Sequence, residues 1–191
     1  MGAADLGLRH ALDAAAAATT TAAALAIIEA ALNDEQLQQA ALLHHARGKL
    51  LLQAGRVDDA IAAGQRAIAL EPGVPDFASN LGSALLARYR SKKQPADLVA
   101  AERVLQDAVY LGPKTPEVRA TLVVALLQQG RFDDALKIAD DNLAVFVDDE
   151  ITRFNKAIVL QARGDIVGAR ALLSALATTF APAKDALLRL R

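Results

Sequence analysis

The chain of 191 residues has no cysteine and no tryptophan, and aromatic residues make up only 4% of it. The absence of cysteine excludes disulfide bonds and thiolate zinc sites. A surplus of basic residues is also missing, because 21 lysines and arginines face 22 aspartates and glutamates. Proteins that bind nucleic acids usually need such a surplus to neutralise phosphates, so we expect no nucleic-acid partner.

Long apolar runs are missing as well. The longest uncharged stretch covers residues 14–28, which is shorter than the ~18 residues that a membrane-spanning helix needs. Asp13 and Glu29 flank this stretch, and Asp5 accompanies the single Arg9 where a signal peptide would be basic. We therefore expect a cytoplasmic chain without membrane insertion.

The residues that are present favour helices. Hydrophobic residues make up 53% of the chain, and most of them are alanine and leucine. Both are good helix formers, and the period-two runs of β-branched residues that are typical of strands are absent. The composition predicts an all-α fold.

A short motif recurs along the chain. "GRVDDA" begins at Gly55, "GRFDDA" begins 75 residues later at Gly130, and "GDIVGA" begins after a further 34 residues at Gly164. Two periods of 34 residues plus seven extra residues account for the longer spacing. We place the extra residues in "YRSKKQP", residues 89–95, because Pro72 and Pro113 are also separated by 34 plus seven residues.

A 34-residue period in a helical sequence resembles the tetratricopeptide repeat, and Gly48, Ala60, Ala67 and Pro72 match its pattern of small residues and proline. The resemblance implies a right-handed superhelical α-solenoid of antiparallel helix pairs. Four units are expected, at residues 41–74, 75–115 (with the seven-residue insertion), 116–149 and 150–181. Asn142 departs from the pattern, and it must find a buried partner or mark a local register shift.

Both ends of the array need a polar outer surface. We expect residues 1–40 to form a degenerate helical hairpin that caps the first unit. Residues 182–191 are expected to form a closing helix that turns Leu187, Leu188 and Leu190 inward.

The paired aspartates of the motif have two interpretations. Asp58–Asp59 and Asp133–Asp134 follow glycines that suit the left-handed residue closing a helix. At the start of the next helix, a carboxylate can accept hydrogen bonds from free backbone N–H groups, which favours helix capping. A metal or catalytic site would need further ligands, because neighbouring residues on a helix point about 100° apart.

No other cluster indicates catalysis. His44 and His45 are adjacent and diverge, so they cannot hold one metal ion together. The basic residues Arg88, Arg90 and Lys92, with Lys93, are expected in the lengthened turn, as a solvated loop or as a docking point for an acidic partner or for the rest of a larger protein. We expect no enzyme activity, no cofactor and no metal.

The resemblance implies that the first helix of each unit lines a concave groove that binds a partner protein. The predicted groove residues are His45, Lys49, Leu52, Asn80, Ser83, Leu86, Thr121, Val124, Gln128, Phe154, Asn155 and Ile158. Glu117 and Ile151 occupy further groove positions, and Glu117 with Thr121 argues against the clamp with which some repeats hold a terminal carboxylate. Asn80 and Asn155 resemble a partial asparagine ladder of the kind found in the repeats of protein O-glycosyltransferases, which would bind a peptide backbone.

The sequence therefore predicts a non-catalytic module that binds a peptide or helical segment of a partner protein. One alternative is the substrate-recognition part of a larger protein-modifying enzyme, such as a glycosyltransferase. A second alternative is a self-assembling scaffold, in which the partner is another copy of the chain.

Overall fold

The computed structural model describes residues 2–112 and 115–190, and its elements there are all helices. They are α1 (Ala3–Ala17), α2 (Thr21–Leu32), α3 (Ala41–Gln53), α4 (Val57–Leu70), α5 (Pro75–Lys92), α6 (Pro95–Leu111), α7 (Pro116–Gln128), α8 (Phe132–Val145), α9 (Glu150–Arg163), α10 (Ile166–Leu176) and α11 (Ala181–Arg189). The predicted all-α fold is confirmed. Pro113, which helped to set the period, and Arg191, in the expected closing helix, lie outside the described residues.

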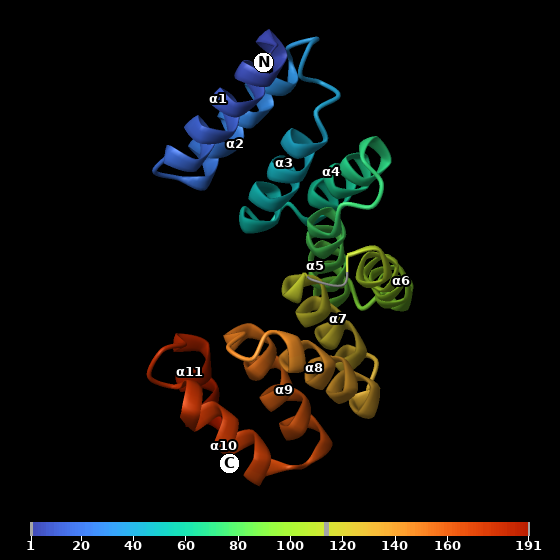
Figure 1. Cartoon of the computed structure of the whole chain (residues 1–191), viewed down its shortest axis with the longest axis vertical. Coiled ribbons are helices and arrows are strands. Elements are labelled where there is room, and N and C mark those ends of the chain that lie inside the picture. The colour runs from blue at the N-terminus through green and yellow to red at the C-terminus, as the bar shows by residue number, and fades with distance from the viewer. Residues whose placement is uncertain (1, 113–114, 191) are drawn as a thin grey trace.

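The helices form antiparallel pairs that stack along the long axis of the molecule (Figure 1). Each pair packs on the next through contacts of α4 with α5, α6 with α7 and α8 with α9. One apolar core follows the stack from Leu25 of α2 to Leu190 after α11. Because each pair leaves an apolar face that its successor covers, the core is continuous along the array.

Three glycines close the first helix of a pair. Gly55, Gly130 and Gly164 have φ angles of 75°, 74° and 97°, which is the left-handed conformation that glycine adopts without steric cost. They follow α3 and α7 and form the C-cap of α9. The interpretation of these glycines as helix ends is confirmed.

The predicted capping by the paired aspartates was wrong. At the N-termini of α4 and α8, no side chain caps the helix by accepting a hydrogen bond from a backbone N–H group. Instead, Arg56 Nε donates to Asp59 Oδ2 at 2.8 Å, and Arg131 Nε donates to Asp134 Oδ2 at 2.7 Å. The arginine that precedes each helix thus bonds the carboxylate that would have bonded the backbone, although the carboxylate still favours the positive end of the helix dipole.

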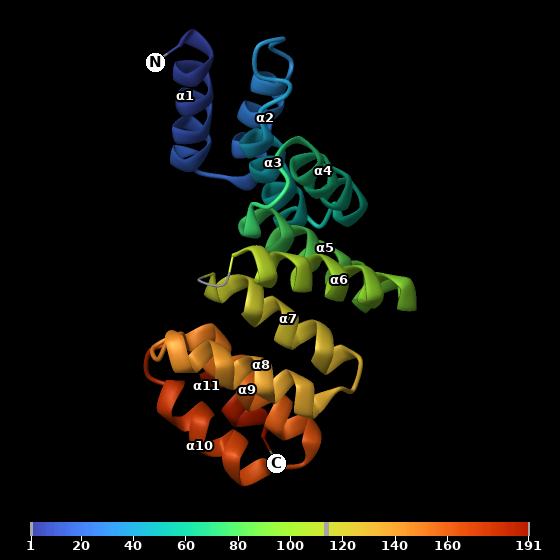
Figure 2. The ribbon, with the colours of Figure 1, turned by 45° about the vertical axis from the view of Figure 1, so that its right-hand side comes forward.

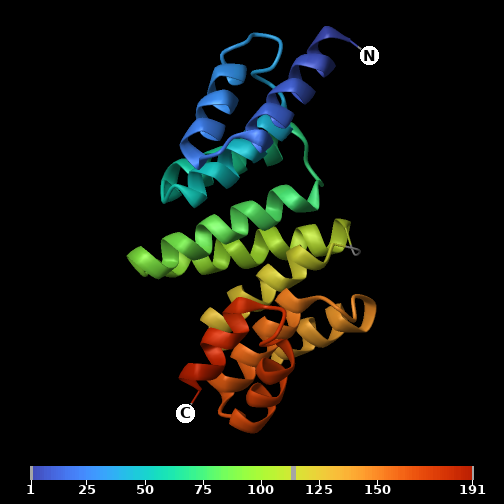
Figure 3. The same cartoon turned by 90° about the vertical axis from the view of Figure 1, so that its left-hand side faces the viewer.

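The seven extra residues of the second unit lengthen its helices. α5 has 18 residues and α6 has 17, whereas α7 has 13 and α8 has 14. Figure 3 shows the two long helices side by side. The expected loop at residues 89–95 was wrong, because α5 continues to Lys92 and only Lys93, with a left-handed φ of 54°, and Gln94 separate it from α6.

Part of the basic cluster forms a polar network between three helices. Arg88 donates through Nη2 to Asp97 Oδ1 at 2.6 Å and through Nε to Asp97 Oδ2 at 3.0 Å. Asp97 is only 2% exposed, so this two-fold pairing compensates a buried carboxylate. Asp58 of α4 accepts a bond from Arg88 at 3.3 Å and one from Lys92 at 2.7 Å. The network ties α5 to both neighbouring helices.

Asn142 is fully buried and finds partners rather than shifting the register. Its Nδ2 lies 2.7 Å from Thr152 Oγ1 and 3.3 Å from both Asp149 Oδ2 and the Pro116 carbonyl oxygen. Asp149 also accepts a bond from the Thr152 backbone N–H and so caps α9. Asn142 therefore connects α8 to the starts of α7 and α9.

The two ends differ in how they are covered. The α1–α2 hairpin lies at the N-terminal end, where α2 packs on α3 (Figure 2). At the other end Leu190 is buried and Leu187 half-buried, but Leu188 is 79% exposed, so its predicted inward orientation was wrong. Neighbouring residues of a helix point about 100° apart, which takes Leu188 away from the face that Leu187 turns to the core.

Candidate functional site

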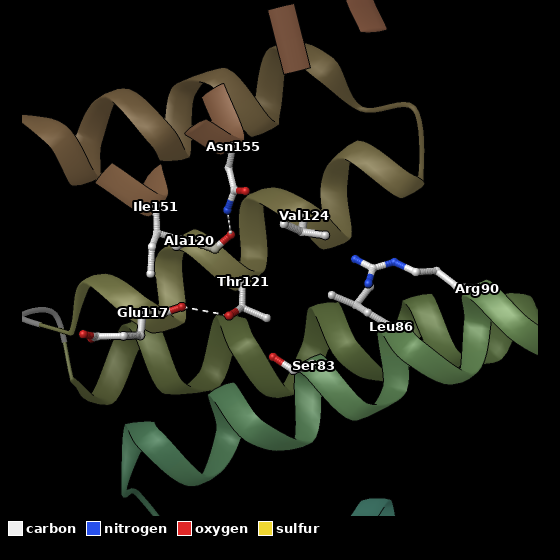
Figure 4. Close-up of a pocket in the computed structure, with 9 residues that line it drawn as sticks. All are labelled: Ser83, Leu86, Arg90, Glu117, Ala120, Thr121, Val124, Ile151 and Asn155. Atoms are coloured by element: carbon white, nitrogen blue, oxygen red, sulfur yellow. Dashed lines mark hydrogen bonds between the residues drawn. The ribbon is translucent and has the colours of Figure 1, made fainter. Parts of the chain in front are cut away.

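The first helices of the pairs lie side by side. α3 contacts α5, α5 contacts α7, and α7 contacts α9. Between the last three of these helices lies a cavity of about 300 Å³ (Figure 4). Its lining residues are Ser83, Leu86 and Arg90 of α5, Glu117, Ala120, Thr121 and Val124 of α7, and Ile151 and Asn155 of α9.

The lining mixes apolar, polar and charged side chains. Leu86 and Val124 lie near the end of the cavity where Arg90 enters from α5, and Glu117 lies at the opposite end beside Ile151 (Figure 4). The hydroxyl and amide side chains of the lining lie between these two ends, so the cavity has charged ends and a middle of mixed polarity (Figure 4).

Hydroxyl groups join α5 to α7 at the Glu117 end. Thr121 Oγ1 donates to the Glu117 carbonyl oxygen at 2.8 Å and lies 3.2 Å from Ser79 Oγ. These bonds fix the Thr121 side chain at the wall of the cavity. The wall is therefore ordered by contacts within the array.

Both asparagines of the expected ladder make hydrogen bonds within the array. Asn155 Nδ2 donates to the Ala120 carbonyl oxygen at 3.0 Å, and Asn80 Nδ2 donates to His45 Nδ1 at 3.1 Å. Each amide thus donates an N–H group to a neighbouring helix. The two side chains join first helices to one another, and the geometry offers no support for a ladder that grips a peptide backbone.

His45 is held as a neutral acceptor for Asn80. Burial lowers the pKa of His45 below its ordinary value; nearby Lys49 lowers it further, while Asp76 acts in the opposite direction. The His45 ring also packs on Phe77, with ring centroids 4.9 Å apart. His45 therefore has a structural contact where the sequence predicted a groove position.

The twelve predicted groove residues separate into three groups. Ser83, Leu86, Thr121, Val124 and Asn155 line the main cavity. Phe154 and Ile158 line a second cavity of about 400 Å³ between α9 and α11. The ring centroids of Phe154 and Phe180 are 5.4 Å apart. The other five line neither cavity: His45 and Asn80 bond to each other, Lys49 is exposed, Leu52 packs against the core, and Gln128 is half-buried.

Two lining residues, Arg90 and Ala120, were absent from the predicted groove positions. Arg90 follows Leu86 by four residues, which is the spacing of one helical face. A continuous helix through residue 92 would have placed it on the groove side, but the 34-residue register assigned it to a turn. Ala120 is 2% exposed and carries the carbonyl that Asn155 bonds, a backbone role that its side chain does not signal.

Comparisons with known proteins agree with this architecture. Two family models of the tetratricopeptide repeat match the chain, one over residues 41–74 and the other over residues 95–151. The chain contains tetratricopeptide repeats. A comparison with curated proteins gives no match.

Solved structures show the same fold. A tetratricopeptide repeat protein of Thermus thermophilus, TTC0263, has a TM-score of 0.82 at 22% identity, with 98% of each chain covered. A repeat protein from Parabacteroides merdae has a TM-score of 0.71 at 16% identity, covering 98% of this chain and 72% of that one. YrrB, described as having an unusual peptide-binding site, has a TM-score of 0.60 at 20% identity, covering 87% and 82%. The predicted right-handed superhelical α-solenoid is confirmed.

The helices are also informative about membranes. In the described parts of the chain, no helix combines the length and the hydropathy that crossing a membrane requires.

Proposed function

We propose that this repeat array is a non-catalytic interaction module that binds an extended segment of a partner protein across α5, α7 and α9. The observation that carries the proposal is the cavity of about 300 Å³, because it takes lining residues from three successive first helices. A chain lying there would contact all three units at once. Residues 1–40 and 182–191 would cap the array of four units at its two ends.

The relatives support binding of this kind in general terms. Tetratricopeptide repeats are interaction modules that bind proteins or peptides, and YrrB is a repeat protein whose description names a peptide-binding site. The position of the site on this chain rests on the cavity alone.

The two other functions are weaker. Recognition for a glycosyltransferase depended on Asn80 and Asn155, whose amides bond within the array. Self-assembly has no lining feature that favours a second copy over another protein. A molar mass that stays that of a monomer as concentration rises, measured by light scattering, would exclude it.

The test is selection of short peptides from a displayed random library against the full chain. Binding of the selected peptides is then measured by fluorescence anisotropy for the wild type and for Val124→Glu. We expect at least about a tenfold loss, because the new carboxylate lies on the apolar wall that the peptide would cover. Ser83→Tyr, which fills the cavity from α5, should have a similar effect.

Val99→Glu is the matched control. Val99 is 67% exposed on α6 and does not line the cavity, so this substitution introduces the same negative charge away from the proposed site. Circular dichroism melts of all variants check that they fold. Selected peptides that bind Val124→Glu and Ser83→Tyr as tightly as the wild type would refute this location of the site.

A further inference from the structure

Arg90 differs from the other basic residues around it. Arg88 and Lys92 bond to Asp97 and Asp58, and the Lys93 ammonium lies 5.2 Å from the centre of the Tyr89 ring. Arg90 is exposed, and within the described residues its side chain forms neither an ion pair nor a hydrogen bond. Its guanidinium turns toward Leu86 and Val124 at the edge of the cavity (Figure 4).

The lengthening of α5 puts this cation in the groove. α3 and α7 end at Gln53 and Gln128, which correspond in the repeat to Ala87 of α5. The five additional residues of α5 continue the helical face that carries Ser83 and Leu86, and Arg90 lies on that face. The insertion therefore adds a groove position that the standard repeat does not have.

The opposite end of the cavity carries the opposite charge. Glu117 is exposed, and within the described residues its backbone oxygen accepts hydrogen bonds while its carboxylate forms none. Between Glu117 and Arg90 lie the apolar side chains of Leu86, Val124 and Ile151, together with the hydroxyl and amide side chains of the lining. The site thus has one cationic end, one anionic end and a middle of mixed polarity.

Building on the proposed function, we propose that the groove selects an extended protein segment in which an aspartate or glutamate side chain pairs with Arg90, a basic residue meets Glu117, and apolar residues between them cover the apolar side chains of the cavity. A guanidinium matches a carboxylate with two parallel hydrogen bonds. A basic residue at the Arg90 end would face repulsion, so the two charges set the direction in which the segment lies. We assign a side chain and not a terminal carboxylate, because Arg90 is the single cation among the described residues that line the cavity.

The charges act mainly on selectivity. Arg90 lies at a solvent-exposed edge, where salt screens an ion pair and reduces its contribution to affinity. Contacts with the apolar side chains of the cavity should supply most of the affinity, and the charged ends should decide among apolar segments. Binding that weakens moderately with salt, rather than vanishing, is the expected behaviour.

The experiment uses the same displayed library with the full chain. Peptides selected on the wild type should be enriched in aspartate and glutamate on one side of an apolar stretch and in lysine and arginine on the other. Arg90→Glu should weaken a selected peptide about tenfold, and replacing that peptide's acidic residue by lysine should restore binding to the variant. Arg103→Glu is the matched control, because Arg103 is exposed on α6 and does not line the cavity.

The outcomes separate this inference from the proposed function. Two outcomes would overturn the inference alone. The selected peptides could depend on Val124 without being enriched in acidic residues, or their affinity could fall equally with Arg90→Glu and with Arg103→Glu. A selection without peptides that depend on Val124 would overturn the proposed function and this inference with it. Peptides that lose affinity when their C-terminus is amidated, but not when their acidic side chain is replaced, would point to a terminal carboxylate and contradict the assignment.

Discussion

The α5–α6 hairpin and the α7–α8 hairpin share a backbone plan but are stabilised by different contacts. Both turn through a left-handed residue, Lys93 in the first and Gly130 in the second. In the longer hairpin the turn region is held by Arg88 on a buried carboxylate, whereas in the shorter one Arg131 bonds to more exposed groups. The repeat thus determines where helices end and pack, while individual side chains determine how strongly each hairpin is held.

The largest expected effect comes from breaking the buried pair. Arg88→Met leaves the Asp97 carboxylate, which is 2% exposed, without its guanidinium. An unpaired buried charge costs several kcal/mol, and we expect the free energy of unfolding to fall by about 3 kcal/mol. Urea denaturation of both proteins measures the difference.

Arg131→Met is the corresponding change in the shorter hairpin. Arg131 is 43% exposed, and surface ion pairs contribute about 0–1 kcal/mol each, so the loss should be much smaller. Equal losses for the two variants would contradict the view that the hairpins are held by different contacts.

The second prediction concerns a position that both hairpins need. Ala135 and its counterpart Ala101 are both 0% exposed. Ala135→Leu inserts three carbon atoms into a closed contact between helices, and we expect a loss of about 1–3 kcal/mol, seen as a lower melting temperature. Asp134→Asn, one residue earlier on the exposed surface, should leave peptide binding nearly unchanged. Mild and equal effects of both substitutions would mean that the register is misassigned.

The two hairpins also differ in which of their two helices carries the larger residue at a shared contact. Gly82 lies against Leu105 in the longer hairpin, and a Cβ added there would come within 2.9 Å of three Leu105 side-chain carbons. The same repeat positions in the shorter hairpin hold Val123 and Ala139, both 0% exposed. A large residue on one helix accompanies a small one on the other in both hairpins.

Gly82→Ala should therefore destabilise by about 1–2 kcal/mol, because the overlap with buried Leu105 outweighs the better helix propensity of alanine. Adding Leu105→Ala should recover part of the loss that Gly82→Val causes alone, which a double-mutant cycle of urea denaturations would measure. Gly48→Ala is the control, since its nearest contact would be an ordinary 3.4 Å. Strictly additive effects of the Gly82 and Leu105 substitutions would show that the two positions do not compensate each other.

Sequence spacing predicted what depends on local geometry. The left-handed glycines follow from the 34-residue period, and seven of the nine cavity residues follow from the groove positions of the repeat that the period resembles. The continuation of α5 was missed because the register treated the insertion as a turn, although residues 86–94 contain neither glycine nor proline. The bond from Asn80 to His45 depends on how closely two separate helices approach, and one-dimensional spacing does not encode that distance.

The smallest expected effect concerns the link between the two hairpins. Glu102 of α6 accepts bonds from Arg131 Nη1 at 2.6 Å and Gln129 Nε2 at 2.9 Å, both after α7. Burial acts to raise the pKa of Glu102, but the hydrogen bonds from Gln129 and Arg131 outweigh it and hold the pKa below the ordinary 4.5. The link therefore stabilises the fold through the ionised carboxylate.

A lowered folded-state pKa fixes the direction of the pH dependence. The stabilisation by Glu102 is fully present above pH 4.5, which is the pKa of Glu102 in the unfolded chain. It is lost as the pH falls through the lower pKa that Glu102 has in the folded chain. Near neutral pH the wild type should exceed Glu102→Gln in free energy of unfolding by up to about 1 kcal/mol, and the difference should shrink below pH 4.5. Because all other carboxylates titrate in both proteins, subtracting the two urea-derived pH profiles isolates Glu102. A difference that stays constant with pH would assign the link to hydrogen bonds that glutamine can also make, and the charge would then contribute nothing to joining the hairpins.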